Sequence, residues 1–383
     1  MKAILLVPRL PGTGFTGDRL RAEIHLQALH DAGFETTIVG GAGPREKPDV
    51  PLAARVVPVA LSAARVPLAM ARLVLSGDPL QSALFAGDFR SALKAAGGAD
   101  LVVALLLPRL LSHVSGALPE APLVVDFVDA LAEAARQAAR HDPAPWRRAY
   151  WTLEAPRLLR AEERAARGAA VLLATTPADA ARLPPGTRAV ANGVVLLPAG
   201  PARRGPLVAF TGRLMYRPNR LAARRLLEDI WPRVKRAVPD ARLLLGGADA
   251  PREIREAGGH GGVQVVSPVP DMAAFLRTAR VVVAPVDLGT GTPNKLFEAF
   301  EAGAAVVASP GAVLRAASSG GFPPASTADT DEEFARAIAD YLGDPERAER
   351  DGAAGRAFVE AHADRRASVA GFVAAYRAAR GSP

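Results

Sequence analysis

Short apolar segments alternate with longer amphipathic ones along the chain, and this alternation limits the fold more than any other feature. In the first part of the chain KAILLVP, ETTIVGG, DLVVALL, APLVVDFVD and AAVLLATT are almost continuously apolar. Strands that are apolar on both faces are typical of a parallel sheet covered by helices on both sides. The amphipathic stretch from 19 to 32, which ends at Gly33, is predicted to be the first of these helices.

The same alternation starts again after residue 206. Here LVAFTGRL, ARLLLGG, GVQVVSPV, RVVVAPV and AAVVAS are the predicted strands. The connection VANGVVLLPAGPARRGP, residues 190–206, is rich in Pro and Gly and has no periodicity, as expected between domains. The sequence therefore predicts an α/β protein with two Rossmann-like domains, 1–198 and 199–360, followed by a terminal segment, 361–383.

Composition excludes several classes of protein. The 383 residues include no cysteine, which rules out a disulfide scaffold, thiol catalysis and a cysteine-based zinc site. The six histidines show no ligand spacing, so no metal is expected. The net charge of +8 is shared equally: residues 1–200 hold 22 basic and 18 acidic groups, and residues 201–383 hold 25 and 21. This even distribution argues against a nucleic-acid-binding domain.

Hydropathy indicates a cytoplasmic protein. The N-terminal apolar segment AILLVP is too short for a signal peptide and is predicted to be a buried strand. The longest apolar run, LVVALLLPRLLSHV, is interrupted by Pro108 and Arg109, so no segment reaches transmembrane length.

One local excess of positive charge lies within residues 136–167. This stretch has eight arginines and four acids, with Trp146, Tyr150 and Trp151 among them. One interpretation is a solvated helical face whose aromatic side chains pack inward. The other is a basic, aromatic surface for peripheral contact with the inner face of a membrane, or for an anionic acceptor.

The segment GTGTPNKLFEAFEAG, residues 289–303, is the strongest candidate for a binding site. Gly289 and Gly291 allow close approach of a ligand, and Pro293 favours the first turn of a helix. The N–H groups of that turn favour a phosphate. Lys295 adds a mobile charge, and Glu298 on the next turn could accept hydrogen bonds from sugar hydroxyls. The alternative for Lys295 is an ordinary surface lysine, although only five of the 47 basic residues are lysines.

A second candidate lies in FTGRLMYRPN, residues 210–219. A predicted strand ends at Thr211, Gly212 permits a turn, and Arg213 and Arg217 follow. Arginine holds phosphate oxygens in a fixed fork and stays charged. The alternative is a cluster of surface salt bridges.

Other polar residues allow two interpretations each. Asp126 and Asp129 in DFVD end a predicted strand, where they could orient or deprotonate an acceptor hydroxyl, or cap the next helix. His25 and His113 are predicted to be hydrogen-bonded structural residues. One aspartate of DTD, residues 329–331, is predicted to cap the helix that follows rather than to bind a metal.

Together these motifs resemble the family 4 type of GT-B glycosyltransferase, and in particular bacterial sugar transferases of PEP-CTERM and exopolysaccharide systems. The resemblance covers nearly the whole chain and includes GFTGDRLRAEIHLQAL, DFVDAL, NGV at 192–194, FTGRLMYRPN, VPDMAAFLRTARVVVAPV and GTGTPNKLFEAFEAGAAVVAS. It implies two Rossmann-like domains facing across a cleft, with the acceptor bound by the first and the nucleotide sugar by the second. The last helix, roughly 355–380, would cross back over the first domain.

The resemblance also implies roles for individual residues. The donor diphosphate would be bound by Gly212, Arg213, Gly291, Thr292 and Lys295. Glu298 would bind the ribose, and Val269 and Asp271 would line the base. Gly17 and Arg19 would belong to the acceptor-side loop, and Asp18 and Asp129 would be the catalytic residues. The sequence departs from the family at Thr290, where a second glutamate is common, and at Pro218, where a lysine is common.

The expected function is metal-independent, retaining transfer of a sugar from a UDP- or GDP-type donor to a hydroxyl acceptor, which could be a glycan, a lipid-linked molecule or a small molecule. No cofactor and no nucleic-acid partner are expected. One alternative is a nucleotide-sugar epimerase or hydrolase on the same fold. Another is a donor-binding subunit without activity, which Thr290 in place of the glutamate would permit.

Overall fold

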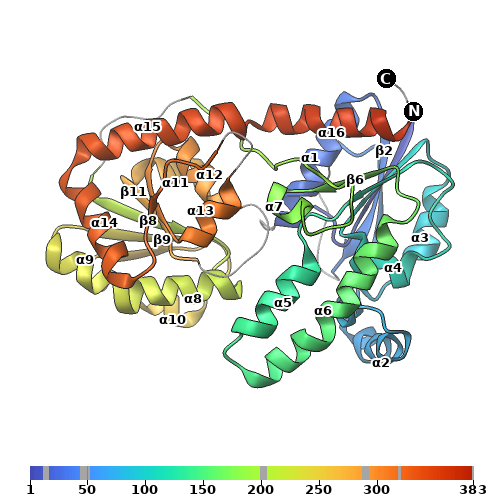
Figure 1. The fold of residues 1–383 in the computed structure, drawn as a ribbon, viewed down its shortest axis with the longest axis horizontal. Coiled ribbons are helices and arrows are strands. Elements are labelled where there is room, and N and C mark those ends of the chain that lie inside the picture. Colours follow the sequence, from blue (N-terminus) through green and yellow to red (C-terminus); the bar gives the residue numbers. More distant parts are fainter. Residues whose placement is uncertain are drawn as a thin grey trace. The chain divides into compact units, whose positions relative to one another are not determined.

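The structure is a computed structural model, which describes residues 1–11, 17–43, 50, 52–198, 205–286, 293–317 and 321–381. The chain forms two compact units, which are Met1–Asn192 with Ala367–Pro383, and Gly193–Arg366 (Figure 1). The domain limits 1–198, 199–360 and 361–383 stay predictions.

The first unit is built on a seven-stranded sheet in the order β3-β2-β1-β4-β5-β6-β7, in which every pair is parallel. Its strands are β1 (Lys2–Val7), β2 (Glu35–Ala42), β3 (Arg55–Ala60), β4 (Leu101–Leu105), β5 (Leu123–Asp126), β6 (Val171–Ala174) and β7 (Arg188–Ala189). Its helices are α1 (Gly17–Asp31), α2 (Val66–Ser76), α3 (Phe89–Ala96), α4 (Leu107–Val114), α5 (Leu131–His141), α6 (Pro145–Ala166) and α7 (Pro177–Ala180), with 3-10 turns η1 (Ala63–Arg65) and η2 (Leu80–Phe85). The predicted parallel sheet is confirmed.

The sequence pattern missed strand β3. It contains Pro58, whose nitrogen cannot donate a hydrogen bond to a neighbouring strand. The strand lies at the edge of the sheet and pairs only with β2, where a missing N–H is tolerated.

The second unit has a six-stranded parallel sheet in the order β10-β9-β8-β11-β12-β13. Its strands are β8 (Leu207–Thr211), β9 (Arg242–Gly246), β10 (Val263–Val266), β11 (Val281–Ala284), β12 (Ala305–Ala308) and β13 (Ser326–Thr327). Its helices are α8 (Arg217–Arg225), α9 (Trp231–Ala237), α10 (Arg252–Glu256), α11 (Met272–Thr278), α12 (Asn294–Glu301), α13 (Pro310–Ala316), α14 (Asp331–Gly343) and α15 (Pro345–His362).

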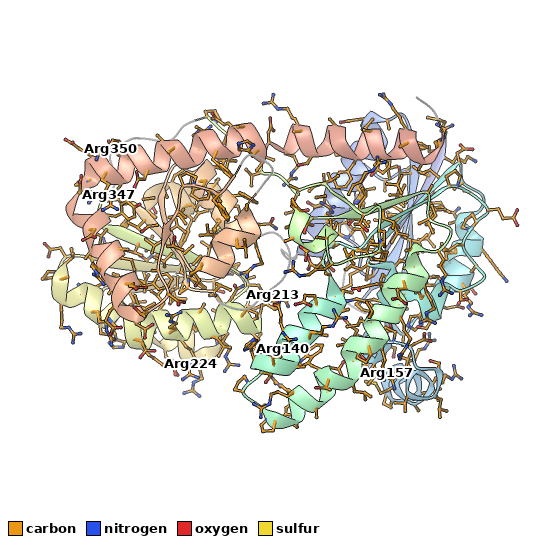
Figure 2. All side chains as sticks on the ribbon, in the orientation of Figure 1. Arg140, Arg157, Arg213, Arg224, Arg347 and Arg350 are labelled. Carbon is orange, nitrogen blue, oxygen red and sulfur yellow. The ribbon has the colours of Figure 1, made fainter. Side chains whose placement is uncertain are left out.

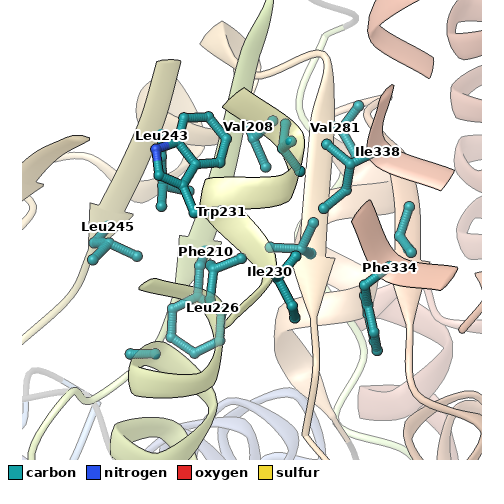
Figure 3. Close-up of a cluster of buried hydrophobic side chains, with 14 of the residues drawn as sticks. Val208, Phe210, Leu226, Ile230, Trp231, Leu243, Leu245, Val281, Phe334 and Ile338 are labelled. Carbon is teal, nitrogen blue, oxygen red and sulfur yellow. The ribbon is translucent and has the colours of Figure 1, made fainter. Parts of the chain in front are cut away.

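A π-helical turn, η3 (Leu226–Ile230), joins α8 to α9 and carries part of the core of this unit. Figure 3 shows Leu226 and Ile230 packed against Phe210 of β8, with Phe334 of α14 beside them. All four side chains are fully buried, so Leu226 and Ile230 belong to the buried face of this helical segment.

The end of the chain differs from the prediction of one helix over 355–380. There are two helices, α15 and α16 (Arg365–Ala379), and the chain leaves helical geometry between them. The break is stabilised by Val194, which forms a parallel bridge with Asp364 and whose N–H donates to the carbonyl of Ala363. Helix α16 packs on α1, as Tyr376 and Phe372 contact His25, so the expected return to the first domain is confirmed for α16.

The cap of α14 is also different from the prediction. Thr330, rather than Asp329 or Asp331, is the N-cap, and it forms a capping box with Glu333. Asp331 instead forms an ion pair with Arg225 at 2.7 Å. No helix in the described part of the chain is long and apolar enough to cross a membrane.

Candidate functional site

Two glycine turns meet at the carboxyl ends of β8 and β9. Gly212 has φ +150° and Gly247 has φ +148°, and the N–H of Gly212 donates to the carbonyl of Gly246 at 3.1 Å. A Cβ atom on Gly247 would lie 1.7 Å from the carbonyl oxygen of Gly212, so only glycine fits. This contact fixes the loop that carries Arg213.

Arg213 follows this turn and is about half exposed (Figure 2). Its Nε donates to Oδ2 of Asp249 at 2.7 Å, and Asp249 has a left-handed backbone with φ +56°. The pair agrees with the salt-bridge alternative, but an exposed ion pair contributes only about 0–1 kcal/mol. A ligand with more negative charge could therefore compete with Asp249 for the guanidinium.

Asn219 connects this loop to the start of α12. Its Oδ1 accepts a hydrogen bond from Nζ of Lys295 at 2.7 Å, and its Nδ2 donates to the carbonyl of Arg213 at 3.1 Å. The side chain is buried, and a Cβ on Gly212 would lie 2.6 Å from its Nδ2. Asn219 therefore positions Lys295 and the Arg213 loop at once. No role was predicted for Asn219, although it is the last residue of FTGRLMYRPN.

Lys295 is not an ordinary surface lysine. Besides its bond to Asn219, Nζ lies 4.6 Å from the centroid of the Phe210 ring, and the side chain is partly buried. Burial lowers the pKa of Lys295 to about 7, with a smaller contribution from Arg315 of α13, while Glu298 acts in the opposite direction. The amine is thus held where a bound anion would stabilise its charged form.

The two glutamates of α12 have different environments. Glu301 is buried and accepts hydrogen bonds from the N–H of Leu197 and from the guanidinium groups of Arg277 and Arg356, so it is structural. Glu298 is partly buried, and burial raises its pKa despite the nearby Lys295 and Arg365. Its carboxyl group has no hydrogen-bond partner among the described residues, which leaves its oxygens able to accept from a ligand's hydroxyls.

The other residues predicted to bind the nucleotide sugar are Val269, Asp271, Gly291 and Thr292. The side chain of Val269 lies beside Gly246, at the end of β9. Asp271 caps α11 by accepting from the N–H of Ala274 at 2.9 Å, so its carboxylate already has a structural function. Gly291 and Thr292 lie outside the described residues.

In the first unit, the start of α1 is anchored by a buried network around Asp126. Nε of Arg21 donates to Oδ2 of Asp126 at 2.7 Å, and Nε2 of His25 lies 2.7 Å from the same oxygen. Burial alone would raise the pKa of Asp126, but the charge of Arg21 and the bond from His25 hold it well below its usual range. Arg21 also donates to Oδ1 of Asn192, which gives the NGV motif a structural role.

His25 completes this network as a neutral residue. Burial lowers the pKa of His25. A neutral imidazole that donates from Nε2 to Asp126 must accept at Nδ1, where the hydroxyl of Tyr376 lies 2.6 Å away. The predicted structural role of His25 fits this geometry, as does that of His113, whose Nε2 lies 2.9 Å from the carbonyl of Ser82. Asp126 is therefore a structural residue.

Asp129 lies three residues further on, at the same end of β5. The preceding Val128 has φ +64°, a strained conformation for a β-branched residue that redirects the chain after the strand. Burial, and then repulsion from Asp179, raise the pKa of Asp129 to about 7. The helix-capping alternative for Asp126 and Asp129 is wrong, because Glu162 accepts from the N–H of Ala132 in the first turn of α5.

Gly17, Asp18 and Arg19 form the start of α1. Asp18 is partly exposed and Arg19 is buried, and Gly17 is open enough that an added Cβ would meet nothing within 4 Å. Nothing in these positions assigns them a role by itself. No group of three or more His, Asp or Glu side chains that could hold a metal ion occurs in the described part of the chain.

The fold, with its two parallel Rossmann-like sheets, belongs to the GT-B class. Residues 205–344 match the model of the family described as "Glycosyl transferases group 1". Over this stretch the second unit is therefore similar to group 1 glycosyltransferases. No curated protein matches the sequence.

Several solved structures share the fold over nearly the whole chain. Sucrose-phosphate synthase (tll1590) from Thermosynechococcus elongatus has a TM-score of 0.73 at 18% identity, with 98% of both chains covered. Anabaena Alr3699/HepE in complex with UDP-glucose has a TM-score of 0.67 at 15% identity, covering 97% of this chain and 98% of that chain. "Trehalose-6-phosphate from E. coli bound with UDP-2-fluoro glucose" has a TM-score of 0.64 at 12% identity, covering 98% of both.

Proposed function

We propose that the protein transfers the sugar of a UDP-sugar to a hydroxyl acceptor, with retention of configuration and without a metal ion. A bacterial exopolysaccharide or PEP-CTERM-associated sugar transferase is the proposed subtype. One observation carries the proposal. Lys295 donates a hydrogen bond to Asn219, which donates one to the carbonyl of Arg213. Close to Lys295 lies Glu298, a partly buried glutamate with no hydrogen-bond partner among the described residues.

The donor diphosphate would lie between Arg213 and Lys295. A diphosphate needs positive charge that remains in place as the bond to the sugar breaks, and fixed cations and N–H groups supply it. The first turn of α12 adds its N–H groups beside Lys295. Gly212, Gly291 and Thr292 belong to the same proposed site.

Glu298 would bind the ribose hydroxyls. A carboxylate facing a diphosphate would repel it, whereas one turned to a diol accepts two hydrogen bonds. Val269 and the backbone near Asp271 would line the base. We choose uridine because UDP or a UDP-sugar is bound in the Anabaena HepE structures and in the E. coli structure.

The first unit would bind the acceptor, which is a glycan, a lipid-linked molecule or a small molecule. Gly17, Asp18 and Arg19 form the proposed acceptor-side loop. Asp129, whose pKa of about 7 suits proton transfer near neutral pH, would orient or deprotonate the attacking hydroxyl. Peripheral contact of residues 136–167 with the inner face of the membrane is part of the same proposal.

The test measures thermal stability and turnover with UDP-glucose. UDP-glucose is expected to raise the melting temperature equally with magnesium and with EDTA, since the protein's own cations would hold the diphosphate. UDP release that requires an added acceptor is the expected activity. Stabilisation that EDTA abolishes would contradict the metal-free site.

The same assay distinguishes the alternatives. Donor binding without turnover across a panel of acceptors would indicate a non-catalytic donor-binding subunit. Release of free glucose, or formation of an epimer seen by NMR without acceptor, would indicate a hydrolase or an epimerase.

A further inference from the structure

The basic stretch 136–167 directs its acidic side chains inward. Three of its four acids, Asp142, Glu154 and Glu162, are buried, and each accepts a hydrogen bond from a backbone N–H. Only Glu163 is exposed, whereas none of the eight arginines is buried. The outer surface of α5 and α6 is therefore more positive than the composition of the stretch indicates. Arg140 of α5 and Arg157 of α6 are labelled in Figure 2.

Helix α2 presents an apolar surface to solvent. Its sequence VPLAMARLVLS has one charged residue, Arg72, and no acid. Leu68, Val74 and Leu75 are 60%, 52% and 89% exposed, and only Leu73 is buried. Leu68, Ala71 and Leu75 are three and four residues apart, so they share the outward face. A solvated helix would normally carry polar residues there.

Helices α2 and α6 are neighbours. Tyr150 of α6 and Met70 of α2 pack against one small core around Leu73. Arg157 of α6 donates to the carbonyl of Leu73 at 2.9 Å, and Arg164 forms an ion pair with Asp78, just beyond α2. In Figure 1, α2 and the tip of the α5–α6 hairpin both lie at the lower end of the first unit. The tip carries Trp146, which is 68% exposed.

We propose that this face, made of the outer side of α2 and the arginines of 136–167, binds a membrane that contains anionic lipids. Helix α2 would lie in the plane of the interface with Leu68 and Leu75 among the acyl chains, while the arginines contact lipid phosphates. Trp146 would lie at the level of the headgroups, where indole rings are favoured. The inference rests on the peripheral contact proposed above and adds α2 as the element that inserts.

A lipid surface explains both halves of this face. Arginines alone would suit any polyanion, including a nucleic acid. Exposed leucines on an acid-free helix gain nothing from a phosphate backbone, but they lose contact with water when they enter a bilayer. A bilayer with anionic lipids interacts favourably with both kinds of residue, because its phosphates attract the arginines and its acyl chains accommodate the leucines.

The test measures vesicle binding by flotation, comparing pure phosphatidylcholine with phosphatidylcholine that contains phosphatidylglycerol. The protein is expected to float only with the anionic vesicles, and its tryptophan fluorescence should shift to shorter wavelength, a shift that Trp146→Phe should reduce. Leu68→Ser/Leu75→Ser should weaken binding by at least tenfold. Arg147→Gln/Arg160→Gln should weaken it by about fivefold per arginine, and high salt should act in the same way.

Matched controls lie in the second unit. Leu221→Ser removes an exposed leucine, and Arg252→Gln/Arg350→Gln makes the same change in charge; both should bind vesicles like the unaltered protein. A cooperative thermal unfolding transition shows that each variant is folded. Its shift with soluble UDP-glucose is measured beside it, so failure of the proposed donor site is detected separately from failure of the membrane site.

Two results would overturn the proposal. One is the absence of binding to anionic vesicles. The other is binding that survives Leu68→Ser/Leu75→Ser unchanged, particularly if RNA or heparin binds equally well, because the face would then be a general polyanion site. Leu75→Ser alone repeats the test at a side chain so exposed that its loss does not unfold the protein.

Discussion

The affinity for UDP-glucose is expected to decrease as the pH rises above about 7, because Lys295 loses its proton. Burial lowers the pKa of Lys295 to about 7 in the free protein. A diphosphate beside Nζ favours the ammonium form, so the pKa should rise again in the complex. At a pH between these two pKa values, binding of one UDP-glucose molecule is accompanied by uptake of one proton from solvent by Lys295.

The size of the effect follows from the number of pH units crossed. At pH 8.5 the amine is about 1.5 units above its pKa, and protonating it costs about 2 kcal/mol. UDP-glucose should therefore bind about 30-fold more weakly at pH 8.5 than at pH 6. The dissociation constant should change little below about pH 6.5 and should approach a tenfold increase per pH unit above about pH 8.

Isothermal titration calorimetry in buffers of different ionisation enthalpy measures both the affinity and the proton uptake. Two variants isolate Lys295. Lys295→Arg keeps its charge throughout, so its affinity should not change with pH. Lys295→Met carries no charge, so it should bind weakly at every pH and take up no proton.

As the pH rises, the contribution of Lys295 to protein stability should increase while the affinity for UDP-glucose decreases. The unfolded lysine has a pKa of 10.5, so between about pH 7 and 10.5 the unfolded state holds more protons. The contribution of Lys295 to the free energy of unfolding therefore rises with pH. Relative to the unaltered protein, Lys295→Met should increase the free energy of unfolding most at pH 6. An affinity that is independent of pH, or a slope retained in Lys295→Met, would refute this account.

Four further predictions concern the other site residues. Arg213→Ala should weaken UDP-glucose binding and change the free energy of unfolding by about 0.5 kcal/mol or less, because its pair with Asp249 is exposed. Asp126→Ala should lower the free energy of unfolding by about 3–5 kcal/mol in denaturant titrations, because it leaves the buried charge of Arg21 without its carboxylate partner. Glu298→Gln should cost about 1.5–3 kcal/mol of donor affinity, and a 2′-deoxyribose donor should lose much of the same energy. Asp129→Asn should lower turnover and remove a pH-rate limb near 7, while raising the melting temperature more at pH 8 than at pH 5, since its raised pKa makes ionisation unfavourable for folding.

Each of these predictions has an outcome that contradicts it. Unchanged donor affinity in Arg213→Ala would place the diphosphate elsewhere. A stability loss below about 1 kcal/mol for Asp126→Ala would mean that the network is not the anchor of α1. Additive losses for Glu298→Gln and the deoxyribose donor would show that this carboxylate does not touch the ribose. A pH-rate profile unaltered by Asp129→Asn would exclude it as the titrating group.

The fold class could be predicted from the sequence because it depends on local patterns. Continuous apolar strands such as Val281–Ala284, and helices with apolar spacing of three and four, identify parallel sheets with covered faces. The turn at Gly212 and the placement of Lys295 and Glu298 on successive turns of one helix are also local, since they follow from residues adjacent in the chain. The capping box of Thr330 and Glu333 is also a local pattern, so it could have been predicted. The prediction chose a neighbouring aspartate instead because aspartate is a common N-cap residue.

Other features depend on residues that only the fold brings together. Asn219 and Lys295 are 76 positions apart, and Asp249 reaches Arg213 only because β8 and β9 are neighbours in the sheet. The break between α15 and α16 arises from hydrogen bonds to Val194, far away in the sequence.

The number of charged residues is likewise set by the sequence, whereas the fold determines which of them are exposed. The sequence determined that residues 136–167 hold twice as many arginines as acids, but burial of Glu154 and Glu162 decided which charges reach the surface. It likewise determined that Lys295 begins a helix, while packing against Phe210 and Asn219 decided its pKa. Periodicity and turn chemistry are properties of neighbouring residues, whereas burial and electrostatic environment are properties of distant segments that meet only in the folded chain.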